Sequence, residues 1–379
     1  MPNLPFKKRP EDFIVKERHN LFFKPRGEYA YFLLKKRNCN TLDALKLLAR
    51  QLRVPLDQVG FAGLKDKLAI TEQVISVPKR YVTAQNYRLS PQVYLRFLGY
   101  GDEPVRLGGF LGNEFTITLH PLTRRQKGRI KKGLGFFAQY GFPNYFGEQR
   151  FGSILGTKDF IARLLLQERY EEALKAYIVS FLKAEERRYL TKLWGKWDLM
   201  LKYIPPNDVT KRTVIKALKR QKPYEKVFRV IPKNIRVMFA FAYQSYLWNK
   251  TLSLYIADHF KHFFIPIALW QFAVYRQIDK KRWKLLKDTR LPYAGTKEIP
   301  GPFKPFFERV IKEEGLDERT FLAERVGIKL FLEGERAIIV IPEGLSIVNE
   351  KKDSLTLHFF LPPNSYATVF LKALIGFNG

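Results

Sequence analysis

Cysteine, methionine and histidine are scarce in this chain of 379 residues, which contains one cysteine, three methionines and five histidines. With Cys39 as the single cysteine, an intramolecular disulfide and a cluster of thiolate metal ligands are both excluded. The histidines occur without an HExxH motif or a paired Cys/His spacing, which are the usual patterns of zinc sites. A zinc hydrolase is therefore not expected, and no metal site is predicted.

Signatures of nucleotide cofactors and of membrane insertion are missing as well. The sequence has no GxxxxGK(S/T) loop, no GxGxxG behind a strand, no GxSxG and no CxxC. It has no apolar run of about 18 residues, and the first residues, MPNLPFKKRPEDF, lack the apolar core of a signal peptide. We therefore expect a cytoplasmic protein without membrane association, whose chemistry requires no cofactor.

Positive charge is what the chain has in excess. Lysine and arginine number 67 against 36 aspartates and glutamates, which gives a formal net charge of +31. Three stretches, 124–132, 211–222 and 276–290, are especially rich in basic residues. Each one alone would be interpreted as a solvated helix face, but together they predict contact with the phosphates of a nucleic acid. They do not distinguish RNA from DNA.

Strand and helix patterns divide the chain into three zones. Alternating polar and apolar residues predict strands up to residue 122, helical spacing dominates about 158–260, and strand patterns return after about 306. The predicted strands are 11–16, 29–35, 69–77, 94–100, 113–122, 328–333, 335–343 and 354–363, and helices are predicted at 41–52, 124–140 and 365–375. This order predicts an α+β fold with a mixed or antiparallel sheet, interrupted by an inserted, helix-rich α/β domain.

The first candidate site is the segment 63–67, in which Asp66 stands between Lys65 and Lys67, behind the glycines Gly60 and Gly63. Nearby cations lower the pKa of a carboxylate and keep it ionised, which suits a nucleophile or a base. The alternative is a solvated surface turn, and the charge pattern alone favours that alternative.

The second candidate site is the segment 144–152, NYFGEQRFG. It combines aromatic rings with Asn, Gln and Arg side chains, which are the residue types that a flipped base requires. The rings can stack on the base, while the amides and the guanidinium reach its edge or a phosphate. A glycine-broken loop whose aromatic side chains belong to the core is the alternative.

Both segments resemble the signature blocks of a known family. FAGLKDKLAITEQ (61–73) and NYFGEQRFG are similar to the two signature blocks of the TruD family of tRNA pseudouridine synthases. Six further blocks match in the family's order over nearly the whole chain. They are PEDFIVKE (10–17), NCNTLDALKLLARQL (38–52), LGGFLGNEFTITL (107–119), YQSYLWN (243–249), ERAIIVIPE (335–343) and LPPNSYAT (361–368).

The resemblance implies an activity and a domain organisation. The family isomerises uridine to pseudouridine in RNA, typically at position 13 in the D arm of tRNA, without a cofactor or a metal. Its pseudouridine-synthase α+β fold would comprise residues 1–169 and 323–379, and its family-specific inserted domain would comprise 170–322. tRNA is then the expected partner, and we predict a monomer.

The resemblance also implies roles for individual residues. Asp66 would be the catalytic aspartate, attacking the target nucleoside at the ribose C1′ or at C6 of the base. Lys7, three residues before the PEDF block, would be its basic partner. Phe146 would stack on the target base and Asn144 would orient the loop or the aspartate. Two further residues, Gln149 and Arg150, would contact RNA or support the site.

One departure from the family's pattern lies near the C-terminus, where Lys372 and Ala373 occupy the place of an Arg-Glu pair. Loss of an ion pair of the last helix is expected from this change. Two non-enzymatic alternatives are a non-catalytic RNA-binding or RNA-chaperone protein on the same fold, and an architectural DNA-binding protein. The first would not need Asp66 and Lys7, and the second lacks a helix-turn-helix or basic-zipper pattern.

Overall fold

The computed structural model describes residues 6, 8–83, 85–154, 159–295 and 297–378. The chain forms two compact units. The first unit comprises Met1–Gly141, Val340–Ala367 and Phe377–Gly379, and the second comprises Phe142–Ile339 and Thr368–Gly376. These units divide the chain at other points than the predicted inserted domain 170–322, whose boundaries stay a prediction.

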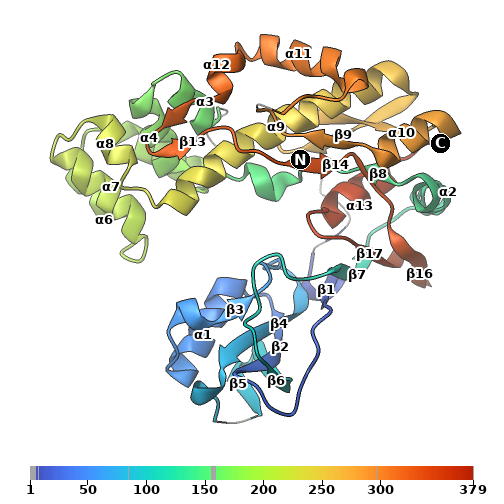
Figure 1. Ribbon diagram of the computed structural model, residues 1–379, viewed down its shortest axis with the longest axis horizontal. Helices are drawn as coiled ribbons and strands as arrows, with labels where there is room; N and C mark the ends of the chain where they lie inside the picture. The colour runs from blue at the N-terminus through green and yellow to red at the C-terminus, as the bar shows by residue number, and fades with distance from the viewer. Residues whose placement is uncertain (1–5, 7, 84, 155–158, 296, 379) are drawn as a thin grey trace. The chain divides into compact units, whose positions relative to one another are not determined.

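A nine-stranded sheet forms the centre of the first unit (Figure 1). Its strand order is β16-β17-β7-β1-β4-β2-β6-β5, and β3 pairs with β4. The strands are β1 (Phe13–Arg18), β2 (Tyr29–Arg37), β3 (Gly60–Phe61), β4 (Ile70–Pro78), β5 (Asn86–Ser90), β6 (Val93–Gly101), β7 (Gly112–Leu119), β16 (Glu343–Lys351) and β17 (Ser354–Leu361). Strands β1 and β4 pair in parallel, whereas β1–β7, β2–β4 and β17–β7 are antiparallel. The predicted α+β class with a mixed sheet is confirmed.

Helix α1 (Thr41–Leu52) covers part of this sheet, and its bounds match the predicted ones. Apolar residues at helical spacing face the sheet, where they form a core with the inward side chains of β2, β4 and β6. The buried members include Ala44, Leu45, Leu48, Leu52, Phe32, Leu34, Ile75 and Leu95. The connection from β3 to β4 contains Asp66 and lies beside this helix. The helix therefore supports this connection.

Helix α2 (Arg124–Tyr140) also begins where the sequence predicts. The Thr123 hydroxyl accepts a hydrogen bond from the amide of Gln126 at 3.2 Å, and the Gln126 side chain accepts one from the amide of Thr123 at 2.8 Å. This reciprocal cap satisfies two amides at the helix start, where no earlier carbonyl is available.

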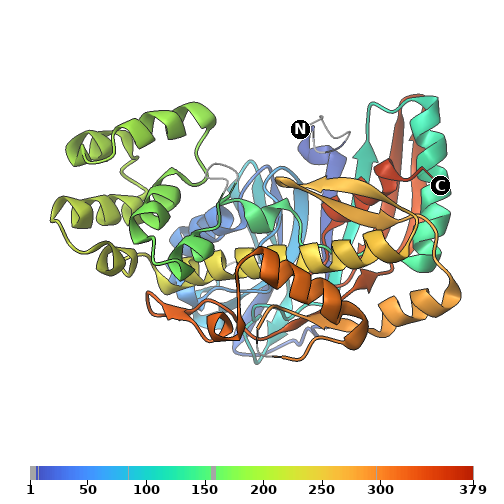
Figure 2. The same ribbon diagram turned by 90° about the horizontal axis from the view of Figure 1, so that it is seen from above.

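The second unit is rich in helices. Its longest helix, α9 (Lys233–His259), runs beside the hairpin of β9 (His262–Ile267) and β10 (Trp270–Tyr275) (Figure 2). The other helices are α3 (Ile161–Leu166), α4 (Tyr170–Val179), α5 (Ala184–Lys192), α6 (Trp197–Tyr203), α7 (Val209–Lys219), α8 (Tyr224–Phe228), α10 (Lys280–Asp288), α11 (Lys304–Glu313), α12 (Glu318–Phe321) and α13 (Ala367–Gly376).

The strand predictions for this unit were less successful. The hairpin β9–β10 had no predicted counterpart, because Ala268 takes the left-handed turn position with φ of 53° and no Asn-Gly or glycine marks the turn. The strand expected at 328–333 shortens to β13 (Ile328–Lys329), which pairs with β12 (Glu324–Arg325). The strand expected at 335–343 divides into β14 (Glu335–Ala337), which pairs with β11 (Arg290–Pro292), and β15 (Ile339–Val340). Within the described ranges, no helix is both long and apolar enough to cross a membrane.

Candidate active site

Asp66 lies half-buried in the connection between β3 and β4. Two buried side chains hold this connection just before Asp66. The Thr41 hydroxyl accepts a hydrogen bond from the amide of Lys65 at 3.0 Å, and the Gln73 amide group donates to the carbonyl of Gly63 at 2.9 Å. Because Thr41 begins α1 and Gln73 lies within β4, the loop is anchored to two rigid elements.

The two glycines of this segment have different reasons to be glycine. A Cβ atom on Gly60 would come within 2.5 Å of the Val105 carbonyl oxygen, so the backbone approach there admits no side chain. A Cβ atom on Gly63 would meet only the Phe110 ring, at 4.0 Å. Packing therefore requires a glycine at position 60. At position 63 there is room for a side chain, so packing does not require a glycine there.

Lys65 points into the first unit and pairs with Glu17 of β1. Its Nζ lies 2.6 Å from Glu17 Oε2, and the two side chains are only 5% and 1% exposed. The ammonium also lies 4.3 Å from the centre of the Phe110 ring. The charge of Lys65 is therefore paired with Glu17, and the Lys67 side chain is exposed. That nearby cations keep Asp66 ionised stays a prediction.

A different lysine reaches the Asp66 segment. Lys36 of β2 is 0% exposed, and its ammonium donates to the main-chain carbonyls of Cys39 at 2.8 Å and Asp66 at 2.6 Å. Burial lowers the pKa of Lys36 to about 8, and the charge of Asp66 acts in the opposite direction. Sequence analysis missed this residue. The signal was present, because Lys36 continues the inward-facing alternation of Ala30, Phe32 and Leu34 along β2.

In the second unit, Asn144 is a buried structural link. Its side-chain oxygen accepts a hydrogen bond from Arg336 Nη2 at 2.8 Å, and its amide nitrogen donates to the carbonyl of Ala337 at 3.1 Å. Arg336 Nε also donates to the main-chain carbonyl of Asn144 at 2.6 Å. These bonds fasten the start of the NYFGEQRFG segment to β14.

Phe146 is held from several sides and is 3% exposed. Asn249 of α9 accepts from its amide at 2.9 Å and donates to its carbonyl at 3.0 Å. The Arg336 guanidinium lies 4.1 Å from the centre of its ring, and the Trp248 ring meets it edge-on at 5.7 Å. Direct stacking of a base on this ring stays a prediction, and it requires one ring face to become more exposed than it is here.

The two remaining predicted residues lie in the short helix η4 (Glu148–Phe151). Gln149 is exposed, and the Arg150 guanidinium lies 5.5 Å from the centre of the Phe146 ring. The adjacent Glu148 forms an ion pair with Lys372 of α13. The expected loss of an ion pair by the last helix is thus wrong, because Lys372 finds a carboxylate outside the helix.

Lys372 itself is a second buried amine. It donates to the carbonyl of Pro266 at 2.7 Å. Burial lowers the pKa of this amine to about 8.

Comparison with known proteins agrees with the two signature segments. A sequence model of the family described as tRNA pseudouridine synthase D (TruD) matches residues 4–264. The chain belongs to the TruD family. It is 40% identical to "tRNA pseudouridine synthase D" of Aquifex aeolicus over 374 residues, which cover 97% of each chain. It is 34% identical to "Probable tRNA pseudouridine synthase D 2" of Methanocaldococcus jannaschii, over 96% of this chain and 90% of that one.

The TruD fold is found in a solved structure too. A crystal structure assigned as a TruD protein of Methanosarcina mazei superposes with a TM-score of 0.69 at 26% identity, covering 98% of this chain and 93% of the other. The resemblance stated from the sequence is therefore confirmed. Of the residues that it singled out, Asp66 lies in the first unit, Asn144, Phe146, Gln149 and Arg150 lie in the second, and Lys7 lies outside the described residues.

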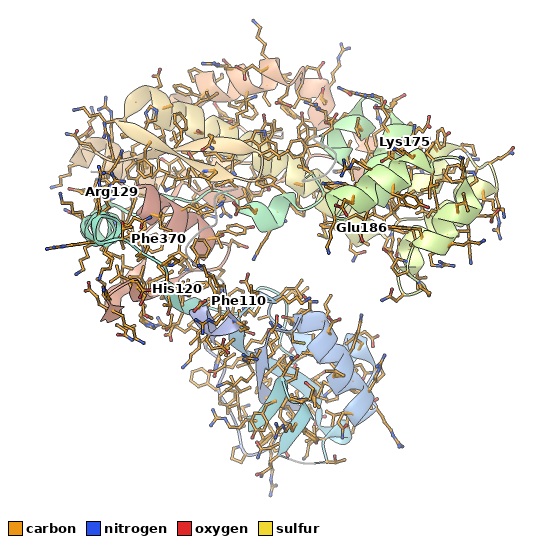
Figure 3. All side chains as sticks on the ribbon, turned by 180° about the vertical axis from the view of Figure 1, so that it is seen from behind. Phe110, His120, Arg129, Lys175, Glu186 and Phe370 are labelled. Atoms are coloured by element: carbon orange, nitrogen blue, oxygen red, sulfur yellow. The ribbon has the colours of Figure 1, made fainter. Side chains whose placement is uncertain are left out.

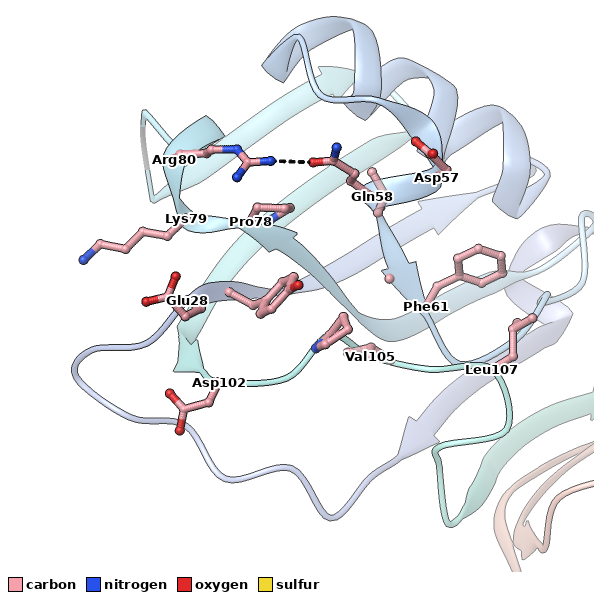
Figure 4. Close-up of a pocket in the computed structure, with 14 residues that line it drawn as sticks. Glu28, Asp57, Gln58, Phe61, Pro78, Lys79, Arg80, Asp102, Val105 and Leu107 are labelled. Atoms are coloured by element: carbon pink, nitrogen blue, oxygen red, sulfur yellow. Dashed lines mark hydrogen bonds between the residues drawn. The ribbon is translucent and has the colours of Figure 1, made fainter.

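A cavity of about 1080 Å³ in the first unit does not have Asp66 among its lining residues (Figure 4). Its lining residues include Pro78, Lys79 and Arg80, which lie at the C-terminal end of β4. Asp66 precedes the other end of this strand. The carboxylates of Glu28, Asp57 and Asp102 also line it, and such a mixture of charges does not favour a polyanion. In the part of the chain that the structure describes, no group of three His, Cys, Asp or Glu side chains could hold a metal ion.

Helix α2 carries a run of basic residues in the first unit. Six of its residues are basic and none is acidic. Lys127 and Lys131 pair with Glu350 of β16 at 3.0 Å and 2.8 Å, whereas Arg125 and Lys132 are exposed. Arg129 is labelled on this helix in Figure 3. Part of the basic stretch is therefore used within the fold, and the remainder is available to an anionic partner.

Proposed function

We propose that this TruD-family chain isomerises a uridine of tRNA, at position 13 of the D arm, to pseudouridine, with Asp66 as the nucleophile and the target base flipped out. The observation that carries the proposal is the anchoring of the Asp66 segment. Gln73 and Thr41 hold the backbone just before Asp66, at Gly63 and Lys65, and Lys36 holds the carbonyl of Asp66 itself. A solvated surface turn, which is the alternative interpretation, does not need three buried polar anchors.

In the proposed reaction, the carboxylate of Asp66 attacks C1′ of the ribose or C6 of the base. The C1′–N1 bond breaks, the uracil rotates, and a C1′–C5 bond forms. The hydrogen on C5 leaves as a proton while N1 acquires one, so substrate and product are isomers. The carboxylate is released unchanged, and the reaction consumes no cofactor. A carboxylate can perform this covalent step only if it is fixed close to the reacting carbon.

The target base must leave the helical stack before Asp66 can reach it, and this unstacking costs a few kcal/mol. A base stacked on an aromatic ring recovers about 1–3 kcal/mol. We propose Phe146 for this role, with Arg150 beside its ring as the group that contacts the RNA. Asn144 would act through its bonds to Arg336, which lies over the same ring. Lys7 keeps its proposed role as the basic partner of Asp66.

The basic surfaces supply the remaining binding energy in this proposal. Exposed cations on α2 and in the stretches 211–222 and 276–290 would contact phosphates without reading the sequence. The inserted domain, at 170–322, would hold the RNA against the catalytic residues of a monomeric, cytoplasmic enzyme.

The decisive experiment measures tritium release from tRNA that contains 5-tritiated uridine. Isomerisation at any uridine must expel the hydrogen on C5, so release reports the reaction directly. We expect release by the wild type, none by Asp66→Ala, and unchanged release by Asp57→Ala, which removes an exposed carboxylate of the same unit. A tRNA with cytidine at position 13 should give no release.

Binding of tRNA has to be measured for the same proteins. Tight binding without release by the wild type on any tRNA would favour the alternative, a non-catalytic RNA-binding protein. Equal release by the wild type and Asp66→Ala would show that another carboxylate is the nucleophile.

A further inference from the structure

The buried ammonium of Lys36 contacts the main chain of the proposed nucleophile, Asp66. The Nζ of Lys36 donates to the carbonyl of Asp66 at 2.6 Å, to that of Cys39 at 2.8 Å and to that of Lys65 at 3.4 Å. One side chain thus holds two consecutive residues of the catalytic segment and Cys39, two residues before the start of α1. Because the side chain is fully buried, the three bonds are shielded from competing water.

Among the described residues, the strand partners of Lys36 are uncharged. Its partners across the sheet are Thr71 of β4 and Val93 of β6. The charged and titratable groups that act on its ammonium are the carboxylate of Asp66, the ammonium of Lys65 and the thiol of Cys39, whose own pKa is raised by burial. Cys39 and Asp66 favour a protonated Lys36, and Lys65, which is itself paired with Glu17, acts in the opposite direction.

We propose that Lys36 is a positioning residue of the reaction: its ammonium fixes the backbone at Asp66 and thereby aims the nucleophilic carboxylate. The inference rests on the proposed function of Asp66 and adds a residue that the sequence did not single out. Lys36 touches neither the substrate nor the reacting atoms in this role. It acts through the main chain of Asp66, and its own protonation state determines how many of the three bonds it makes.

The geometry makes this role dependent on pH. A neutral amine has only two hydrogens, so deprotonation of Lys36 removes one of three bonds to the segment. The pKa of Lys36, about 8, places this loss within a range that is accessible to kinetics. The profile of kcat/KM against pH reports ionisations of the free enzyme and is the appropriate readout.

The test compares wild type, Lys36→Met and two lysine controls in the tritium-release assay, with tRNA affinity measured in parallel. For the wild type we expect kcat/KM to fall above an apparent pKa near 8. For Lys36→Met we expect kcat to fall by about 10²-fold, since a small misplacement of a catalytic group has that effect, with the Kd for tRNA unchanged. The alkaline fall should disappear in this variant.

The controls separate Lys36 from other lysines. Lys35→Met removes the exposed neighbour on the same strand, which pairs with Glu72 at 3.1 Å, and should leave kcat and the pH profile unchanged. Lys372→Met removes a buried amine of the second unit whose pKa is also about 8, and this variant should keep the alkaline fall. If Lys372→Met abolishes the fall instead, the inference is overturned.

Two further outcomes would overturn the inference that Lys36 positions Asp66. One is a Lys36→Met enzyme with wild-type kcat and a wild-type profile. The other is a wild-type kcat/KM that stays flat between about pH 7 and pH 9, and this measurement does not depend on any variant being folded. Both outcomes leave Asp66 as the nucleophile if Asp66→Ala remains inactive. A wild type that releases no tritium from tRNA overturns the proposed function, and the role of Lys36 falls with it.

Discussion

Arg336 binds Asn144 twice, donating from Nη2 to the side-chain oxygen at 2.8 Å and from Nε to the main-chain carbonyl at 2.6 Å. The two residues are separated by 192 positions in the chain, yet both are buried and their bonds join β14 to the start of the NYFGEQRFG segment. The same guanidinium lies over the Phe146 ring. A single arginine therefore supports two residues that the family resemblance singles out.

Replacing this arginine should destabilise the protein. For Arg336→Met we expect a loss of about 3 kcal/mol in the free energy of unfolding, because two buried acceptors on Asn144 lose a charged donor. Denaturant-induced unfolding measures the loss. The matched control is Arg309→Met, which removes an exposed arginine paired with Glu313 and should change stability by less than about 0.5 kcal/mol. Equal effects of the two substitutions would contradict the role of Arg336.

The buried ion pair between Lys65 and Glu17 should show strong coupling. For Lys65→Met alone we expect a loss of about 3–5 kcal/mol, because the Glu17 carboxylate stays buried without its cation. The double variant Lys65→Met/Glu17→Gln should be less destabilised than the sum of the single changes, and a double-mutant cycle on unfolding free energies measures the difference. Strict additivity would mean that the pair contributes no interaction of its own.

Binding of tRNA should weaken steeply with salt. Each phosphate contact contributes about one unit to the slope of log K against log salt, so Arg125→Gln on α2 should lower the slope by about one. Arg106→Gln removes an exposed arginine that is paired with Glu103 and should leave the slope unchanged. Binding that does not change between about 50 and 200 mM salt would contradict the proposed phosphate contacts.

The stability of the protein should depend on pH through Lys36. The folded protein releases this proton near pH 8, whereas the unfolded chain retains it up to the ordinary lysine pKa of 10.5. Between these values the unfolded chain binds more protons, so the wild type becomes more stable as pH rises. Lys36→Met lacks this contribution, and its stability relative to the wild type should therefore fall by about 2 kcal/mol over that window. Unfolding curves measured below pH 8 and near pH 10 test this, and a constant difference would contradict it.

Several features of this protein could be predicted from local sequence. The spacing of Leu45, Leu48 and Leu52 predicts α1 within its observed bounds, and the capping residue Thr123 marks the start of α2. The NYFGEQRFG segment identifies the family. These features depend on residues that are neighbours in the chain, so their physical causes can be recognised without the fold.

The hairpin β9–β10 shows where local sequence was insufficient. Its turn places Ala268 at a positive φ, which a sequence pattern assigns to glycine or asparagine. The hairpin packs beside α9, and tertiary contact of this kind can stabilise a turn that local preference disfavours.

The sequence by itself determined the family, the fold class, the excess of positive charge and the presence of an aspartate between two lysines. Only the tertiary structure decided what those lysines do. Parallel pairing of β1 with β4 brings Glu17 to Lys65, and antiparallel pairing of β2 with β4 brings Lys36 to the carbonyl of Asp66. The physical reason is that a charge in a core is stabilised by whichever polar groups the strand register places beside it, and those groups are distant in the chain.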